Sequence, residues 1–299
     1  MVSTHLESFR VRSYECDLYG HVNNAIYLHY LQEANLSFLS AAGCPPDRYA
    51  ALGLEWWPSR IDFEYLIPLR FGDTVEVSIH PDAISGPTLQ LSFEYHNQRT
   101  GDLVAKGSTL ATLQDAQGSP LENMPSEIQA ALTPEGLEQG RPGLPASPTA
   151  PPPPPGIFRM RKRVAWQDIH AKKELDPATL LVYAGECGRQ VIQAHGWPME
   201  RMLEEGFAIL LRSNQIEYYQ PACLDDELEL STWVSNLRRV SALRHYTIHR
   251  VKDGVLLAQI HALGVWVNLS TGLPRRAPER FLSDFAPNIS TESPATDKR

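Results

Sequence analysis

Apolar residues recur along this chain with two different periods. Spacings of three and four predict a long helix over Asn24–Ala42 and another over Pro177–His195. Strict alternation predicts strands, most clearly over Thr74–His80, Leu89–Tyr95 and Glu227–Trp233. A further strand is expected ahead of each helix, over Glu7–Cys16 and Phe158–Trp166. One long helix followed by a run of antiparallel strands is typical of the α+β class, so we expect a sheet wrapped around each helix.

These helices and strands form two copies of one pattern. Glu64 and Glu217 are separated by 153 positions, as are Pro68 and Pro221, since 217 − 64 and 221 − 68 give the same difference. The same shift matches further pairs without a gap: Val11 and Val164, Leu28 and Leu181, Tyr30 and Tyr183, Gly43 and Gly196, Asp73 and Asp226, and His96 and His249. A constant offset from strand to helix to strand indicates a duplicated domain, and its length excludes a short solenoid repeat.

A proline-rich segment divides the two copies. Residues 128–156 include five consecutive prolines, and such a composition predicts an extended linker that cannot pack a core. We therefore predict an N-terminal domain over residues 1–127 and a C-terminal domain over residues 157–285. Residues 286–299 are polar and aperiodic, which predicts a disordered tail.

An unusual polar cluster precedes the first predicted helix. It consists of Asp17, Gly20, His21, Asn23 and Asn24. The cluster places one carboxylate and several hydrogen-bond donors at a helix N-terminus, where backbone N–H groups and the helix dipole polarise a carbonyl. We predict that this loop contains the reactive groups of the protein.

With this loop and this order of elements, the chain resembles the hotdog-fold thioesterases. More narrowly, it resembles the acyl-CoA and acyl-ACP branch that includes 4-hydroxybenzoyl-CoA thioesterase. Ile61–Asp73, a strand that ends in proline and is followed by Gly-Asp, is similar to the second signature of that family. The resemblance covers residues 7–125 and, through the repeat, residues 158–283. In that family two hotdog domains hold the active sites between them, and a tandem chain resembles such a pair made covalent, as in the plant acyl-ACP thioesterases.

The resemblance implies a role for each group in the loop. Asp17 would be the catalytic carboxylate, acting either as a nucleophile that forms a mixed anhydride or as a base that deprotonates an attacking water. His21 and Asn23 would orient the water or the carboxylate. The backbone N–H groups of residues 23–26 would hold the thioester oxygen as negative charge develops on it.

Five residues are predicted to bind the substrate: Gly20, Asn24, Ala25, Tyr27 and Trp57. Gly20 gives the turn and lets a bulky ligand approach the backbone, while Tyr27 and Trp57 would line the acyl pocket. Structural roles compete at several of these sites. Asn23 also suits a simple helix cap, His21 a hydrogen-bonded structural histidine, and Tyr27 a core position.

The second copy lacks the polar cluster. At the offset of 153, the equivalent positions hold His170, Lys173, Glu174, Asp176 and Pro177. Asp176 still suits an N-cap and Pro177 the first helical position, so the fold is expected to persist without the chemistry. We therefore predict one competent site per chain, in the N-terminal domain.

These features predict an enzyme that hydrolyses acyl-CoA or acyl-ACP to a free acid and a thiol. One alternative is a hotdog-type dehydratase or hydratase, although that class uses a differently spaced histidine with Asp or Glu. Another is a non-catalytic acyl-thioester binding protein, against which the intact Asp17 loop argues. The basic segment Arg159–Arg163 suits either contact with CoA phosphates or an acidic carrier protein, or a solvated strand.

Composition narrows the partners further. The 299 residues carry a net charge of -8, which disfavours nucleic acid as a partner. No run approaches the ~18 apolar residues of a membrane span. The four cysteines have no CxxC spacing, so we expect reduced thiols in a cytoplasmic protein, with no metal and no cofactor. Association of two chains into a homo-oligomer is compatible with the sequence.

Overall fold

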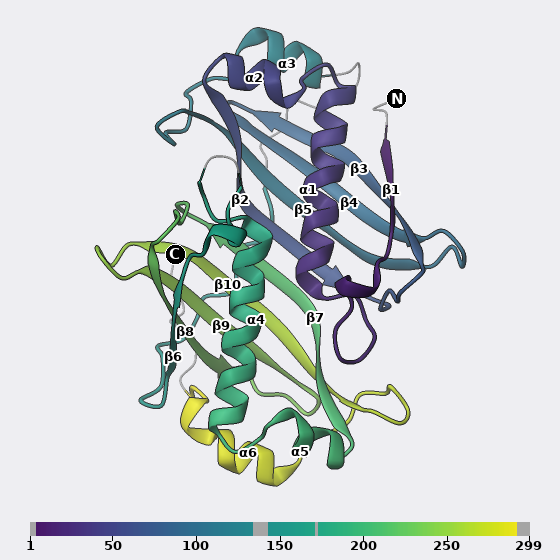
Figure 1. Cartoon of the computed structure of the whole chain (residues 1–299), viewed down its shortest axis with the longest axis vertical. Coiled ribbons are helices and arrows are strands. Elements are labelled where there is room, and N and C mark those ends of the chain that lie inside the picture. Colours follow the sequence, from purple (N-terminus) through teal and green to yellow (C-terminus); the bar gives the residue numbers. More distant parts are fainter. Residues whose placement is uncertain (1–3, 134–142, 171–172, 292–299) are drawn as a thin grey trace. The chain divides into compact units, whose positions relative to one another are not determined.

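The protein consists of two compact units, Met1–Pro145 and Ala146–Arg299. The computed structural model describes residues 4–133, 143–170 and 173–291. In each unit one long helix lies against one face of an antiparallel sheet (Figure 1). The predicted α+β class is therefore confirmed.

The elements occur in the same order in both units. The N-terminal unit contains β1 (His5–Arg10), η1 (Ser13–Glu15), α1 (Asn24–Ala41), α2 (Pro46–Ala51), β2 (Leu54–Tyr65), β3 (Thr74–Ser85), β4 (Thr88–Asn97), β5 (Leu103–Asp115) and α3 (Ser126–Leu132). The C-terminal unit contains β6 (Phe158–Arg163), η2 (Trp166–Asp168), α4 (Pro177–Ala194), α5 (Met199–Glu204), β7 (Phe207–Tyr218), β8 (Glu227–Ser235), β9 (Ser241–Arg250), β10 (Leu256–Asn268), α6 (Glu279–Phe285) and η3 (Ala286–Asn288). Both long helices end within one residue of the predicted ends.

The strand order within each unit is also shared. It is β1-β3-β4-β5-β2 in the first unit and β6-β8-β9-β10-β7 in the second. The register repeats at the offset found in the sequence, because His5 pairs with Ile79 and Phe158 pairs with Thr232. The duplication therefore extends to individual strand pairs.

Aromatic side chains fill the space between helix and sheet in each unit. In the first, the rings of Tyr27 and Phe63 on α1 and β2 meet edge to face at 6.0 Å, and the buried Tyr95 packs against both. In the second, Trp197 and Phe281 meet at 5.3 Å between centroids. Burial of such large side chains contributes about 1.5–3 kcal/mol each.

The first strand of each unit is shorter than predicted. Strands were expected over Glu7–Cys16 and Phe158–Trp166, but β1 ends at Arg10 and β6 ends at Arg163. The cause is local, because the Glu15 carboxylate accepts a hydrogen bond of 2.7 Å from the Arg12 backbone N–H and turns the chain into η1. A side chain that bonds to the backbone in this way competes with strand pairing.

The domain boundaries of the structure differ from the predicted ones at two places. Helix α3 crosses the predicted start of the linker at residue 128, because Ile128 and Leu132 lie four positions apart and are both buried. The second place is the tail, where η3 lies within the segment predicted to be disordered. Asn288 is buried there, and its Nδ2 donates to the Thr232 carbonyl at 2.9 Å. Residues 134–142 of the predicted linker and 292–299 of the predicted tail lie outside the described residues.

The end of the proline-rich segment packs on the C-terminal unit. The indole N–H of Trp233 donates to the Pro151 carbonyl at 3.2 Å, and the Ser290 hydroxyl donates to the Pro152 carbonyl at 3.0 Å. Prolines leave their carbonyls available as acceptors, and here β8 and the chain after η3 supply the donors. This part of the predicted linker is therefore an ordered strap on its domain.

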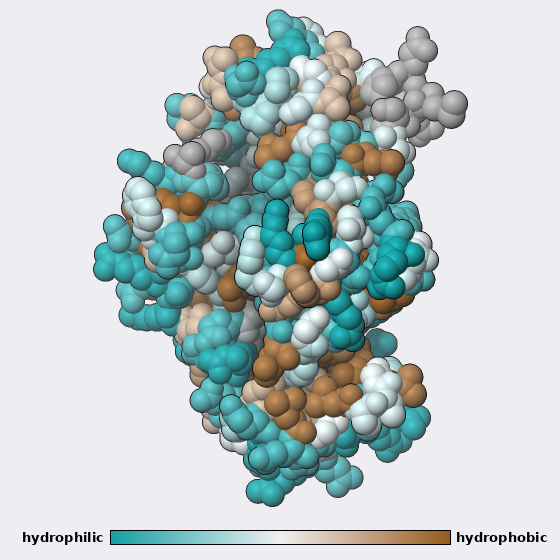
Figure 2. Space-filling view, turned by 45° about the vertical axis from the view of Figure 1, so that its right-hand side comes forward, coloured by the Kyte–Doolittle hydropathy of each residue, from teal (hydrophilic) through white to brown (hydrophobic). Residues whose placement is uncertain are grey.

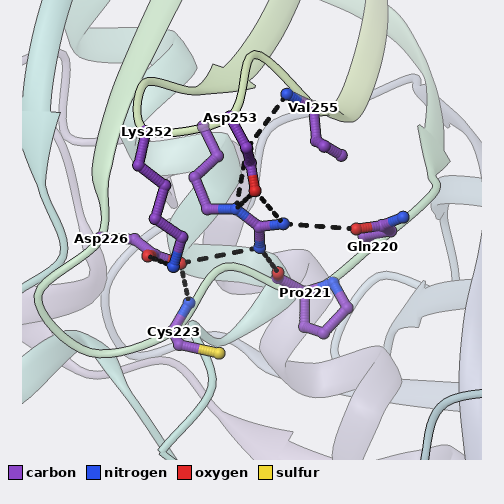
Figure 3. A network of polar contacts seen from close by, with 8 residues as sticks. Gln220, Pro221, Cys223, Asp226, Lys252, Asp253 and Val255 are labelled. Atoms are coloured by element: carbon purple, nitrogen blue, oxygen red, sulfur yellow. Dashed lines mark hydrogen bonds and ion pairs between the residues drawn. The ribbon is translucent and has the colours of Figure 1, made fainter.

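A buried aspartate closes the turn before β3 and β8. Asp226 accepts a hydrogen bond from the Cys223 backbone N–H at 2.9 Å (Figure 3). It also forms ion pairs with Lys252 at 2.7 Å and with Arg250 at 3.8 Å. Asp73, at the equivalent position, accepts from the Arg70 backbone N–H at 2.9 Å. In both copies, an aspartate at the equivalent position therefore stabilises this turn by accepting a backbone hydrogen bond.

The surface mixes polar and apolar side chains, with a hydrophobic patch low in the view of Figure 2 over the C-terminal unit. Single exposed apolar residues are normal on folded proteins. Across the described residues, every helix is too short or too polar to cross a bilayer.

Candidate active site

The Asp17 loop is a tight hairpin that leads into α1. Cys16 and Val22 form an antiparallel bridge, and the Asp17 N–H donates to the His21 carbonyl at 2.7 Å. Gly20 turns the chain with φ at +71°, a value that side chains disfavour. The hairpin places Asp17 opposite His21, which lies two residues before the N-cap of α1.

The Asp17 carboxylate is held at one oxygen and open at the other. Its Oδ1 accepts hydrogen bonds from the backbone N–H groups of Tyr19 at 2.9 Å and His21 at 3.1 Å. No donor among the described residues bonds to Oδ2, and the residue is exposed. The side chain is therefore oriented by its own loop and retains one free oxygen for chemistry.

His21 contacts an arginine that sequence analysis did not single out. The Arg70 guanidinium lies 3.3 Å from His21 Nε2, measured from Nη2, and the two residues also form a backbone bridge. Partial burial and the nearby Arg70 charge lower the pKa of His21 below its ordinary value, while Asp17 acts in the opposite direction. The neutral imidazole is favoured.

The first turn of α1 uses most of its own N–H groups. Asn23 is the N-cap, and its side-chain oxygen accepts from the Ala25 N–H at 3.0 Å. The N–H of Asn23 donates to the Glu15 carbonyl, and that of Ile26 donates to the Asn23 carbonyl. Among the described residues, Asn24 alone of the four predicted donors keeps its N–H without a partner. The expected oxyanion site thus reduces to one helix amide.

Glu15 stabilises the start of the loop. This buried carboxylate accepts a hydrogen bond of 2.6 Å from the Tyr30 hydroxyl on α1 and an ion pair of 3.3 Å from Arg12. It ties the start of the loop to the helix that the loop precedes. Sequence analysis missed this residue, although its repeat partner Asp168 is also acidic.

The predicted substrate residues divide into two groups. Gly20 and Asn24 lie in the loop and at the helix start, and Ala25 is buried with its N–H used in the cap. Tyr27 is buried, and its hydroxyl accepts from the Leu69 N–H at 3.2 Å. Burial raises the pKa of Tyr27 to about 12. The phenol therefore stays protonated in the core.

Trp57 lies away from the loop within its own unit. The hydroxyl of Tyr65 at the end of β2 reaches the Asn24 carbonyl at 3.4 Å. Trp57 precedes Tyr65 by eight residues on that strand, a separation of roughly 26 Å. The N-terminal unit does not bring Trp57 and Asp17 together.

The described residues of the second loop form the same main-chain hydrogen bonds with different side chains. Its His170 N–H donates to the Glu174 carbonyl at 3.0 Å, as Asp17 does to His21. Asp176 caps α4 by accepting from the Ala178 N–H at 2.8 Å. The ring of His170 lies 3.8 Å from the Glu174 carboxylate, measured from Nε2. The predicted loss of the carboxylate, histidine and amides thus occurs on a retained frame.

The basic segment Arg159–Arg163 is engaged in ion pairs. Arg159 lies 3.5 Å from Glu229, and Arg163 lies 3.2 Å from Asp225. These contacts follow the pairing of β6 with β8 and favour the solvated-strand interpretation. Across the described residues no group of three or more His, Cys, Asp or Glu side chains is arranged to hold a metal ion.

Comparison with known proteins gives matches to both halves. A model of the thioesterase-like superfamily matches residues 11–132 and again residues 164–285. The acyl-CoA thioester hydrolase YbgC of Escherichia coli is 26% identical over 129 residues, which are 43% of this chain and 96% of that protein. The chloroplastic acyl-acyl carrier protein thioesterase ATL3 of Arabidopsis thaliana is 32% identical over 133 residues, or 44% of this chain and 68% of that protein.

A likeness in fold extends over nearly the whole chain. The structure of a proposed oleoyl thioesterase from Lactobacillus plantarum matches with a TM-score of 0.75, covering 93% of this chain and 98% of the other at 14% identity. Together with the two family matches, this confirms the predicted pair of tandem hotdog domains. The chain belongs to the thioesterase-like superfamily, with one copy of its domain in each unit.

Proposed function

We propose that this chain hydrolyses acyl thioesters of CoA or acyl carrier protein to a free acid and a thiol, at one site in the N-terminal domain. The observation that carries the proposal is the Asp17 carboxylate, held through Oδ1 by two loop amides and open at Oδ2. The acyl thioesterases YbgC and ATL3, with which the chain shares 26% and 32% identity, support the reaction class.

The chemistry requires one nucleophile and one site for the developing negative charge. In one route, Asp17 removes a proton from water as the water oxygen attacks the acyl carbon; in the other, Asp17 Oδ2 attacks and water then cleaves the anhydride. In both routes the C–S bond breaks, and the thiolate leaves with the pantetheine arm. The free N–H of Asn24 would stabilise the oxyanion together with the α1 dipole.

The remaining side chains would orient the reactants. Among the contacts of the described residues, Asn23 uses only its side-chain oxygen in the cap, and its N–H₂ group would be available to the substrate. A neutral His21 can donate one hydrogen bond to the attacking water or to the substrate. We assign no reaction to the C-terminal loop, where His170 replaces the aspartate and Glu174 the histidine.

The test is release of free thiol from a graded series of acyl-CoA substrates, followed with a thiol reagent. We expect turnover by the wild type and a loss of about 10²–10⁴-fold in Asp17→Asn, which keeps the size of the side chain and removes its charge. The matched control is Asp47→Asn, an exposed aspartate on α2. Absence of thiol release by the wild type with every acyl-CoA and acyl-ACP tested would refute the proposal.

A further inference from the structure

We propose that Arg70 is a positioning residue that holds His21 in the tautomer with its proton on Nδ1. Only the effect on rate rests on the proposed function; the assignment of the proton rests on the contact itself. Arg70 follows β2 in the segment before β3, far in sequence from the loop.

The direction of the hydrogen bond follows from the chemistry of arginine. The guanidinium has donors and no acceptor, and it keeps its proton throughout the normal pH range. Its Nη2 lies 3.3 Å from His21 Nε2, so Nε2 has to be the acceptor. A neutral imidazole with an accepting Nε2 carries its proton on Nδ1.

The backbone fixes Arg70 in this position. His21 and Arg70 form an antiparallel bridge, and the adjacent Val22 N–H donates to the Leu69 carbonyl at 2.9 Å. The Arg70 N–H itself donates to the buried Asp73 carboxylate at 2.9 Å. The guanidinium is thus carried by a braced turn, while its head group is exposed.

The charges around the ring favour the neutral form. In the described part of this domain, Asp17 and Tyr19 face His21 from its own loop, and Arg70 faces it from the turn before β3. Burial and Arg70 lower the pKa of His21, and Asp17 raises it by a smaller contribution. Above that pKa the Arg70 contact selects one of the two neutral tautomers.

The two copies support a shared role for these side chains. At the offset of 153, Arg70 corresponds to Cys223. The backbone bridge between His21 and Arg70 has an equivalent between Glu174 and Cys223. The arginine is therefore absent where the histidine and Asp17 are absent, although the backbone can accommodate it. An arginine needed only for folding would be expected in both copies.

This arrangement separates the roles of Asp17 and His21. With Nε2 occupied by Arg70, the ring offers an N–H donor at Nδ1 and no free lone pair to accept a proton. His21 then orients the substrate or the attacking water, and the task of accepting a proton belongs to Asp17. The prediction differs from a general-base role for His21, in which Nε2 would have to be free.

Side-chain ¹⁵N NMR of the full chain tests the proton assignment directly. His21 is identified by the signal lost in His21→Gln. We expect a protonated Nδ1 and an unprotonated Nε2 in the wild type, and in Arg70→Met a mixture of tautomers with a higher pKa of His21. The control is Arg10→Met, an exposed arginine at the end of β1 that does not contact His21.

A wild-type His21 protonated at Nε2 would overturn the inference, as would Arg70→Met with an unchanged tautomer and pKa. In the thiol-release assay, Arg70→Met should lower kcat by about tenfold to a hundredfold with little change in KM, and Arg70→Lys should recover part of it. If the NMR result holds and no thiol is released by the wild type, the proposed function fails while the Arg70 assignment stands.

Discussion

The loops over residues 16–23 and 169–176 have different side chains, and their described residues form the same main-chain hydrogen bonds. In both, a hairpin bridge closes the loop and an Asn or Asp caps the following helix. A carboxylate before the loop accepts from a helix tyrosine in both, Glu15 from Tyr30 and Asp168 from Tyr183. The main-chain arrangement is therefore maintained by groups other than the proposed reactive side chains, so those side chains could change without loss of the fold.

The two sheets show a second difference of this kind. On β9 and β10 the buried His245 and His261 lie 2.8 Å apart, measured between their Nδ1 atoms, and His245 Nε2 lies 2.7 Å from the Ser235 hydroxyl. At the equivalent positions of β4 and β5 the first unit has Ser92 and Ser108. The C-terminal domain thus has a buried histidine network at positions where the N-terminal domain has two serines.

Exchanging the residues at the two helix caps should lower the rate in the first loop and leave it unchanged in the second. Asn23→Asp keeps the acceptor oxygen that caps α1, since Asn and Asp are nearly equal as N-caps, but it removes the N–H₂ group and adds a charge near Asp17. We expect thiol release to fall by about tenfold or more with no change in melting temperature. The reverse exchange in the second loop, Asp176→Asn, should leave the rate unchanged. Full activity in Asn23→Asp would show that Asn23 only caps the helix and that its N–H₂ group has no role in the reaction.

Acid should act on the C-terminal domain through His245. Burial, followed by the charges of His261 and Arg244, lowers the pKa of His245 from 6.5 to about 3. The unfolded chain therefore binds a proton that the folded domain excludes, and this contribution to stability, complete above 6.5, declines as the pH falls toward 3.

The expected slope is about 1.4 kcal/mol of unfolding free energy per pH unit in that window. Denaturant unfolding at several pH values should show it in the wild type. The His245→Ser variant, which installs the residue found at Ser92, should lose this component of the slope. An unaltered pH dependence in His245→Ser would show that the network does not exclude a proton from the folded state.

The smallest effect concerns the turn residue of each loop. Gly20 and Lys173 both have positive φ, +71° and +64°, which costs a side chain about 1 kcal/mol. Gly20→Lys should therefore lower the unfolding free energy of its domain by about 1 kcal/mol, and Lys173→Gly should raise it by less, because glycine gains entropy in the unfolded chain. Thermal unfolding measures both. Equal melting temperatures for Gly20→Lys and wild type would show that the loop relaxes.

The fold was predictable because its signals are periodic and occur twice. The helix over residues 24–42 ends within one residue of α1, and the offset of 153 recurs in the strand register. The errors lie where one side chain bonds to the backbone or to a distant segment. Glu15 ends β1 early by accepting from Arg12, and Asn288 anchors the predicted tail by donating to Thr232. Neither hydrogen bond produces a periodic pattern of apolar residues in the sequence.

The place of the candidate residues in the fold was predictable, and their contacts were less so. The loop sequence places Asn23 correctly as the N-cap of α1. The contact between Arg70 and His21 depends on how the turn before β3 meets the loop, which residue spacing does not encode. The repeat contained a usable signal, since Arg70 is an arginine in one copy and Cys223 in the other. The sequence does not reveal which N–H groups at the start of α1 have partners. In the structure, the N–H groups of Asn23, Ala25 and Ile26 are used by Glu15 and by the cap.

We propose that the chemistry belongs to one of two loops whose described residues share their main-chain hydrogen bonds. The most direct test of this proposal is kcat/KM for thioester hydrolysis in Asp17→Asn and His170→Asn, measured side by side on the same substrate. We predict a fall of at least about a hundredfold in Asp17→Asn and less than about a twofold change in His170→Asn. Near-wild-type turnover by Asp17→Asn, with loss of activity in His170→Asn, would contradict the account and move the site to the C-terminal domain.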